Sequence, residues 1–315
     1  MRITNKMLSN NFLRDMKTNL NSLSTLQTQM ATGKQIRKAS DDPTKASKIM
    51  QINSDIASNI QYNSNIKNTS TWLDMTDTAL GQVGNVATRI QELLVSAGDA
   101  GHGVDERGAI KDEINQKVGE LSQILNTTFD GKYIFGGTRG TDKPTAAIED
   151  STSKNTPLTL TSTNDKELNQ IGSKLSVEVS QGVTMEYNVT ATEVINYGTG
   201  TDDNLKKLLE NITNHLGSTD ATDIAALNGA DLTGIQAVMT NVLKLRSEVG
   251  AKQNGMESAL ARNEDQNTNM TEVLTSTEDI DITEKAMEYA TMQTVYTASL
   301  QTSAKVLQPS LLDYL

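Results

Sequence analysis

Apolar residues recur at intervals of three and four positions over most of this 315-residue chain, which is the spacing of one face of an α-helix. The N-terminal stretch keeps this spacing up to Gly33, a residue type that commonly ends a helix because it tolerates the left-handed conformation. Asp42 and Pro43 then give a start signal, since aspartate caps a first turn and proline fits the first helical position. We therefore predict one helix that ends near Gly33 and a second that begins at Pro43.

The predicted second helix continues without a proline to a glycine-rich segment at 98–103, and a third helix is predicted over 105–128. Helical spacing returns at Asn204 and is interrupted by a patch rich in Gly, Ser and Asp at 217–223. A long helical stretch follows, and a last helix with the same three-four spacing is predicted over 282–307.

The middle of the chain has a different pattern. Residues 129–144 are rich in glycine and turn formers, and apolar and polar residues then alternate in short runs up to about Tyr197. Alternation with period two is typical of β-strands. The clearest runs flank Gln181 and Gly182, which predicts a β-hairpin with its turn at these residues. The apolar members of these runs are Leu175, Val177, Val179, Met185, Tyr187 and Val189.

The order of helices, strands and helices predicts a mainly α-helical protein with a small β insert. We expect an antiparallel bundle of long helices in which the N- and C-terminal helices pair as a coiled coil and the β domain lies at the distal end. The predicted divisions are a terminal coiled-coil segment (1–42 with 276–315), a helical core domain (43–136 with 203–275) and a β-rich insert domain (137–202).

The charges of the two ends support their pairing. Residues 1–48 hold nine Lys and Arg against three Asp, whereas residues 270–315 hold seven acidic residues against two Lys. Opposite charge on two helical ends favours their association and helps to set its register. The alternative is that the basic end is an arm that binds a membrane or nucleic acid.

These end helices define a candidate assembly interface, through which copies of the chain are predicted to associate. Polar residues also occur at in-register positions, where they cost stability but restrict register and partner choice. We hypothesise that the ends are loosely structured in the monomer and become ordered on assembly; the alternative is a coiled coil that is stable alone. The candidate interface residues are Leu13, Met16, Leu20, Leu23, Met30, Ile282, Ala286, Tyr289, Tyr296, Leu300 and Leu307. The polar in-register residues are Gln27, Thr76, Gln253, Asn263, Asn267, Gln293 and Ser303.

Composition narrows the class of protein further. Hydrophobic residues make up 36% of the chain and aromatic residues 3%, which favours apolar stripes along helices over one rounded core. The net charge of −11 argues against a global role in binding nucleic acid, because phosphate contacts need clustered Lys and Arg. Cysteine is absent, so disulfides, thiolate metal sites and cysteine nucleophiles are excluded, and the absence suits a chain that is exported unfolded.

Recognisable catalytic motifs are missing from the sequence. His102 and His215 lie in different segments without the further ligands that a zinc site needs, and no phosphate-binding loop or nucleophile elbow occurs. We therefore expect no enzyme activity, no cofactor and no metal site. The N-terminus has no apolar core of a secretory signal peptide, and no apolar run is as long as a membrane span.

Both ends carry motifs that resemble the flagellin superfamily. They are Arg2-Ile-Thr-Asn-Lys-Met-Leu, the stretch from Leu23-Ser-Thr-Leu-Gln to Gly33-Lys-Gln-Ile with Ala39-Ser-Asp-Asp-Pro after it, and Asp281-Ile-Thr-Glu-Lys-Ala-Met-Glu-Tyr-Ala. Within this family, Phe129-Asp-Gly-Lys-Tyr-Ile-Phe-Gly-Gly-Thr resembles the signature of the subunits that join the flagellar hook to the filament. The segment from Thr32 to Ala39 also differs from that of most filament flagellins, which favours the junction branch.

The resemblance implies a structural subunit in a ring or tube of identical copies at the hook–filament junction of the bacterial flagellum. It implies secretion through the flagellar type III export apparatus after a transient stay in the cytoplasm, where a chaperone holds the C-terminal region. Hook-associated protein 1 and flagellin are the implied axial neighbours. Two alternatives stay open: a filament flagellin, which differs by its high copy number, and a soluble coiled-coil scaffold protein of another class.

Overall fold

The computed structural model describes residues 5–98, 103–151, 154–162, 164–198 and 204–306. Contacts between residues divide the chain into two compact units. The terminal unit comprises Met1–Ser58 and Asp265–Leu315, and the core unit comprises Asn59–Glu264. Two long helices, α2 (Pro43–Ala97) and α8 (Leu232–Glu278), contribute residues to both units.

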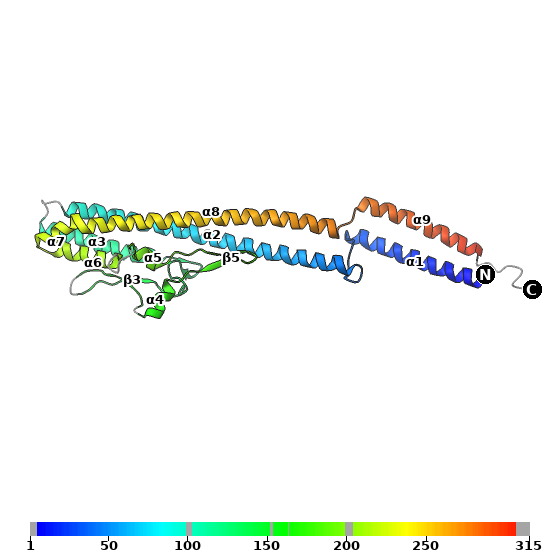
Figure 1. The fold of residues 1–315 in the computed structure, drawn as a ribbon, viewed down its shortest axis with the longest axis horizontal. Coiled ribbons are helices and arrows are strands. Elements are labelled where there is room, and N and C mark those ends of the chain that lie inside the picture. The colour runs from blue at the N-terminus through cyan, green and yellow to red at the C-terminus, as the bar shows by residue number, and fades with distance from the viewer. Residues whose placement is uncertain (1–4, 99–102, 152–153, 163, 199–203, 307–315) are drawn as a thin grey trace, which may run out of the picture. The chain divides into compact units, whose positions relative to one another are not determined.

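In the terminal unit, helices α1 (Asn5–Thr32) and α9 (Ile282–Val306) lie side by side and antiparallel (Figure 1). Helix α1 ends where the sequence predicts, because Gly33 adopts a left-handed backbone conformation with φ of 73°. The Gly33 carbonyl then accepts a hydrogen bond of 3.1 Å from the backbone N–H of Ile280, which ties the end of α1 to the start of the returning helix. The predicted pairing of the two ends is therefore confirmed.

The start of α2 also agrees with the sequence. The Asp42 carboxylate accepts hydrogen bonds from the backbone N–H groups of Thr44 (3.0 Å) and Lys45 (3.1 Å), which have no partner within the helix. Pro43 occupies the first helical position, where a missing N–H costs nothing. These local signals explain why a 55-residue helix begins at this point.

In the core unit, α3 (Val104–Leu125) packs against α6 (Leu205–Gly217). The unit has one contiguous apolar core, in which residues such as Leu80, Phe135 and Ile212 are completely buried. A π-helix, η1 (Leu227–Asp231), leads directly into α8. The short helices of the core unit are α4 (Asp165–Ile171), α5 (Ala191–Ile195) and α7 (Ala221–Ala226).

The β insert belongs to the core unit. Its described strands form antiparallel pairs, and the predicted hairpin is present as β5 with β6, joined at Gly182 with φ of 73°. Glycine is also required at position 137, since a Cβ there would lie 2.4 Å from the Gln170 carbonyl oxygen. The strand pairs are β1 (Thr128–Phe129) with β2 (Lys132–Tyr133), β3 (Thr145–Ala147) with β4 (Leu158–Leu160), and β5 (Ser176–Ser180) with β6 (Val183–Glu186).

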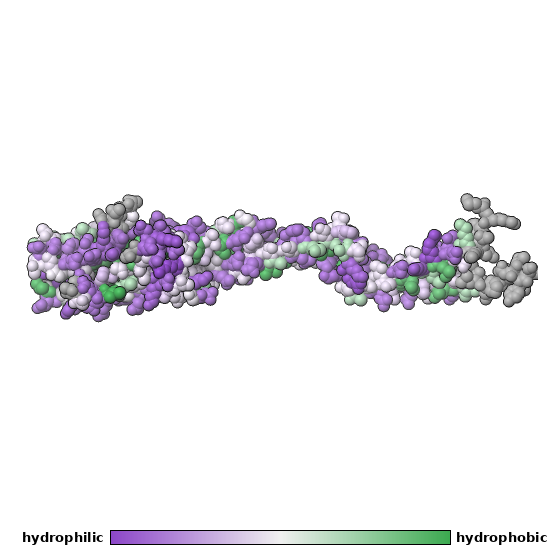
Figure 2. Space-filling model, turned by 90° about the horizontal axis from the view of Figure 1, so that it is seen from below, coloured by the Kyte–Doolittle hydropathy of each residue, from purple (hydrophilic) through white to green (hydrophobic). Residues whose placement is uncertain are grey.

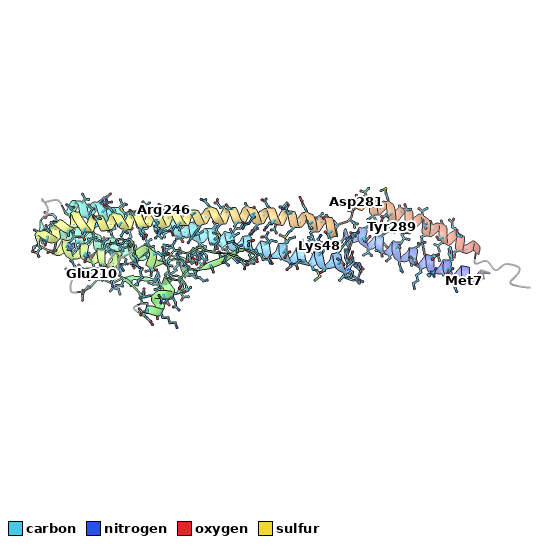
Figure 3. The ribbon with its side chains drawn as sticks, in the orientation of Figure 1. Met7, Lys48, Glu210, Arg246, Asp281 and Tyr289 are labelled. Carbon is cyan, nitrogen blue, oxygen red and sulfur yellow. The ribbon has the colours of Figure 1, made fainter. Side chains whose placement is uncertain are left out.

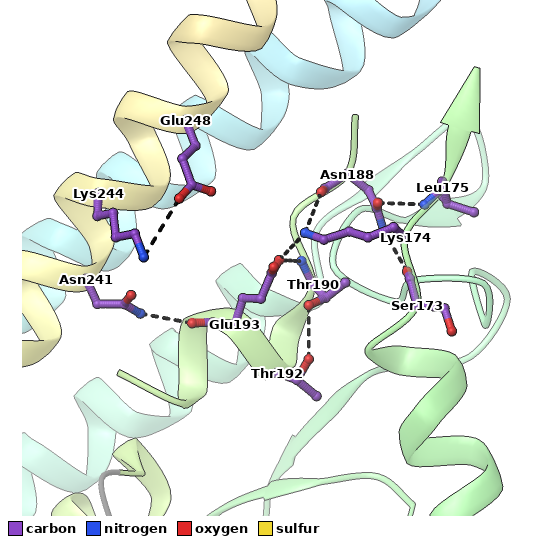
Figure 4. Close-up of polar contacts among 10 residues, drawn as sticks. All are labelled: Ser173, Lys174, Leu175, Asn188, Thr190, Thr192, Glu193, Asn241, Lys244 and Glu248. Atoms are coloured by element: carbon purple, nitrogen blue, oxygen red, sulfur yellow. Dashed lines mark hydrogen bonds and ion pairs between the residues drawn. The ribbon is translucent and has the colours of Figure 1, made fainter. Parts of the chain in front are cut away.

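A polar network joins the insert to the long helices (Figure 4). Glu193 accepts a hydrogen bond from the Thr190 backbone N–H (3.0 Å) and an ion-paired one from Lys174 (2.6 Å), so it closes a capping box at the start of α5. The Asn241 side chain of α8 donates to the Glu193 carbonyl over 2.9 Å. The Asn188 side-chain oxygen accepts a hydrogen bond of 2.7 Å from the Leu175 backbone N–H, which fixes the start of the following strand, β5.

Polar contacts, one buried and one exposed, link α2 to α8. Asn263 is fully buried; its side-chain amide donates to the Val179 carbonyl of β5 (2.8 Å), and its backbone carbonyl accepts a hydrogen bond from the Asn59 side chain of α2 (2.7 Å). Further along, Arg246 of α8 forms a two-pronged ion pair with Asp77 of α2. These contacts match the expectation that polar positions restrict how long helices pair.

The only tryptophan of the chain, Trp72, packs edge-on against Phe129 and Tyr187, with ring centroids 5.9 and 5.8 Å apart.

The helices and strands described above confirm the mainly α-helical fold with paired ends and a small antiparallel insert. No helix in the described part of the chain combines the length and apolarity that crossing a membrane requires.

Candidate assembly interface

The seam between α1 and α9 follows a heptad pattern. On α1, most of the buried and half-buried residues from Ser9 onward recur in steps of three and four, which is the spacing of a coiled-coil contact line. Only Leu26 among them is buried, at 9% exposure. The seam residues of α1 are Ser9, Phe12, Met16, Asn19, Leu23, Leu26 and Met30.

Helix α9 presents a matching but more polar line of residues. The aromatic rings of Tyr289 and Tyr296 alternate with smaller or polar side chains, and Ser303 is buried near the end of the helix. In Figure 3, Tyr289 lies between the two helices, whereas Met7 lies on the outer side of α1. A seam of this composition buries little apolar area, so it stabilises the pair weakly. Its α9 members are Lys285, Tyr289, Met292, Tyr296, Ser299 and Ser303.

The predicted interface residues fall into two groups. One group lies in or beside the seam and is half-buried: Met16, Leu23, Met30, Ala286, Tyr289 and Tyr296. The other group is exposed, namely Leu13 (48%), Leu20 (49%), Ile282 (62%) and Leu300 (42%). Leu307 lies outside the described residues. The structure thus places two different apolar faces on these helices.

Three apolar seam residues, Phe12, Leu26 and Met292, were not among the predicted positions. Burial in the structure identifies them, because a second series with the same three-four spacing runs through Leu13 and Leu20. The predicted α1 series includes Leu13 and Leu20, which lie on the neighbouring face of the helix. That face is rotated by about 100° from the seam, because each residue advances the helix by about 100°.

The polar in-register residues also fall into a buried and an exposed group. Thr76 and Asn263 in the core unit are fully buried, and Gln253 donates to Asp74 over 2.7 Å. In the terminal unit, by contrast, Gln27 and Gln293 are exposed rather than facing the partner helix. The heptad line of the single chain therefore passes beside them, and their contact with a partner stays a prediction.

Charge also joins the two ends locally. Lys34 after α1 forms an ion pair with Glu278 at the end of α8, and the Glu278 carbonyl accepts the Gln35 backbone N–H at 2.6 Å. In the loop before α2, the backbone N–H groups of Lys38 and Arg37 donate to Asp41 and hold the pKa of its carboxyl below the ordinary value. The loop that connects the first two helices is thereby ordered by its own polar groups.

Only His215 of the two histidines lies in the described part of the chain. His102 lies outside the described residues, and within the described part of the chain no cluster of three or more His, Asp or Glu is placed to hold a metal ion. His215, in the last turn of α6, lies 2.6 Å from the buried Asp231 carboxylate. Burial raises the pKa of Asp231, while the hydrogen bond from His215 opposes that rise.

Comparison with known proteins agrees with this architecture. The N-terminal helical region of bacterial flagellin matches residues 3–139, and the C-terminal helical region of bacterial flagellin matches residues 232–315. Flagellar hook-associated protein 3 of Escherichia coli (strain K12) is 25% identical over 285 residues, which cover 86% of this chain and 86% of that protein. A flagellin of Clostridium tyrobutyricum is 22% identical over 357 residues, covering 92% of this chain and 94% of that one.

Among solved structures, hook-associated protein 3 of Legionella pneumophila has a similar fold, with a TM-score of 0.60 at 14% identity; the match covers 72% of this chain and 98% of that one. The chain therefore belongs to the bacterial flagellin family, a family of structural proteins of the flagellum. Within that family it is similar to hook-associated protein 3, in agreement with the motif at residues 129–138.

Proposed function

We propose that this chain is a structural subunit of the bacterial flagellum that joins the hook to the filament. One structural observation carries the proposal: the two ends of the chain pair as helices, yet leave apolar side chains such as Leu13, Leu20 and Ile282 exposed. A helix pair with uncovered apolar residues gains stability when further copies cover them. Similarity to hook-associated protein 3 supports the position of such an assembly at the junction.

The same proposal includes the route and the partners that the family implies. The subunit travels unfolded through the flagellar type III export apparatus, and a cytoplasmic chaperone holds its C-terminal region before export. After assembly it contacts hook-associated protein 1 on one side and flagellin on the other. The absence of cysteine supports this route, because no disulfide has to be broken before the chain passes the channel.

Deletion of the gene, followed by electron microscopy and analysis of the medium, tests the proposal. We expect cells with hooks but no filaments, and flagellin monomers in the medium, because exported flagellin has no junction on which to polymerise. Expression of the chain from a plasmid should restore filaments. Filaments of normal length and number on the deletion strain would contradict the proposal.

A filament flagellin is the second candidate, since the Clostridium tyrobutyricum flagellin matches 92% of this chain. The same deletion separates the two functions. Loss of a filament flagellin removes filaments without releasing another flagellin to the medium. Gold labelling of an epitope-tagged chain gives an independent distinction: a short zone at the hook tip indicates the junction subunit, whereas labelling along the filament indicates flagellin.

A further inference from the structure

An apolar groove runs along the terminal helix pair. It has a volume of about 450 Å³, with Leu26 of α1 on its floor and one face of α9 as its wall. Met287 is 63% exposed and Val295 is 44% exposed, although both are apolar. The α9 residues of the groove recur at steps of three and four, so they share one side of the helix: Glu284, Met287, Glu288, Thr291, Met292 and Val295.

A complementary stripe lies on α1. Leu13, Lys17 and Leu20 follow one another at i, i+4 and i+7, so they share one helix face. All three are exposed, and Lys17 forms no ion pair with any residue that the structure describes. The centre of this face lies roughly 100° around α1 from the seam, because each residue advances the helix by about 100°. The stripe therefore stays uncovered while α1 packs against α9.

The stripe and the groove agree in length. Leu13 and Leu20 are separated by about 10.5 Å along the axis of α1, and Met287 and Val295 by about 12 Å along α9, given a rise of 1.5 Å per residue. In each helix the apolar pair brackets charged or polar residues: Lys17 in the stripe, Glu288 and Thr291 in the groove. Both surfaces thus present apolar ends around a polar centre.

The charges of the two surfaces are opposite. The groove carries Glu284 and Glu288, and Glu288 already pairs with Lys285 of its own helix at 2.7 Å. Glu284 has no ion pair with a described residue. Figure 2 shows apolar and hydrophilic residues next to each other on the visible face of this helix pair. A cationic stripe and an anionic groove attract each other, whereas two grooves or two stripes would bring like charges together.

We propose that the α9 groove of one copy receives the Leu13–Lys17–Leu20 stripe of a second copy. The contact is heterologous, because it joins two different surfaces, and it repeats from copy to copy into a ring or a helical tube. This inference rests on the proposed function and adds to it the surfaces and the direction of assembly. It also implies that assembly weakens as salt rises, since the paired charges lie at an exposed rim.

Disulfide cross-linking tests the contact directly, because the natural chain contains no cysteine. The full-length Leu20→Cys variant is mixed in equal amounts with either Met287→Cys or Val295→Cys, allowed to assemble on isolated hooks, and oxidised. We expect a mixed dimer from one of the two combinations, and its identity gives the direction in which the stripe lies in the groove. The matched control is Thr18→Cys, which is exposed on the other side of α1 and should give no mixed dimer.

Charge exchange supplies a second measurement. Lys17→Glu and Glu288→Lys should each lower the yield of the mixed dimer by about tenfold, because these two residues lie at the polar centres of the stripe and the groove. When both chains of the mixture carry both changes, opposite charges face each other again and the yield should recover. Lys48→Glu changes the net charge as Lys17→Glu does, on an exposed helix position away from the stripe, and should leave the yield unchanged. Circular dichroism of each variant checks that the helices remain folded.

Two results would overturn this inference. One is a disulfide-linked dimer of the Met287→Cys variant alone, at the yield expected for the mixture. This dimer would show that the grooves of two copies face each other. The other is normal assembly on hooks, seen by sedimentation, without any mixed dimer. Neither result affects the junction proposal, which fails instead when the deletion strain builds normal filaments.

Discussion

The core unit and the terminal unit bury their apolar residues to very different extents. In the core unit, side chains from α2, α3, α6, α8 and the β insert meet in one cluster, and Leu80, Leu94 and Phe135 are completely buried. In α1 and α9, by contrast, Leu26 and Ser303 are the only buried residues among those whose side chains the structure describes. Both units use long helices, so the difference lies in how many faces of each helix are covered.

This difference separates folding from assembly. A helix pair covers only one stripe of each partner, whereas the core unit covers its helices with further helices and with the insert. The core unit thus has the contacts it needs within one chain. The terminal unit has apolar residues on a second face that its own chain leaves uncovered, which agrees with the proposed assembly through these helices.

The largest effect is expected from Phe135→Ala in the core unit. The ring is completely buried, so its removal leaves a cavity and should lower the free energy of unfolding by about 3–5 kcal/mol. Urea denaturation followed by Trp72 fluorescence measures this loss, because Trp72 lies in the same core. As control, Leu300→Ala on the exposed side of α9 should change the same transition by less than about 0.5 kcal/mol. Equal effects of both variants would remove the distinction between the units.

A smaller effect is expected from Asn263→Ala. The change leaves the buried Val179 carbonyl without its donor and should cost about 1–3 kcal/mol. Asn254→Ala, at an exposed position of the same helix, serves as control and should be nearly neutral. A neutral Asn263→Ala variant in the same urea titration would mean that this polar contact does not hold α8 to the insert.

An effect of about 1 kcal/mol is expected at the capping box of α5. Burial alone raises the pKa of Glu193, but the hydrogen bonds from Lys174 and Thr190 outweigh it, so the pKa lies below its ordinary value of 4.5. A carboxylate with a lowered folded-state pKa stabilises the fold above its unfolded-state pKa, and this contribution is lost as the pH falls through the folded-state value. Glu193→Gln keeps the hydrogen bond to Thr190 but loses the charge.

The difference in unfolding free energy between the wild type and Glu193→Gln should therefore be constant near pH 7 and shrink below about pH 4.5. Glu193→Ala removes the cap as well and should keep a deficit even in acid. A Glu193→Gln difference that grows as the pH falls would contradict this account of the charge.

The sequence predicted the ends of elements better than the faces that they bury. Gly33, Asp42 with Pro43, and Gly182 act through their own backbone or side chain, so their effect is local and was read correctly. The α1 register was less accessible, because Phe12 and Leu13 lie on adjacent apolar faces and nothing local says which face meets α9. Burial in the structure resolves this in favour of Phe12.

Side-chain contacts between distant segments of the core unit could not be predicted from spacing. His215 lies in the last turn of α6, and its partner Asp231 lies in a π-helix that has no simple sequence signal. The short helix α5 lies inside a region of strand-like alternation, where five residues are too few to show helical periodicity. Both features depend on tertiary packing around the insert.

The smallest effect on the core is expected from Leu26→Ala, although Leu26 is the most buried apolar residue of the described seam. Trp72 fluorescence reports only the core unit, so its urea transition should move by less than about 0.5 kcal/mol. Amide exchange should instead be faster in α1 and α9 than in α3 in the wild-type monomer, and faster still in this variant, because a thin seam opens locally. On assembly the wild-type α1 and α9 should become protected. Strong protection of both helices in the free monomer would show that the seam is stable alone, and it would make the two units alike.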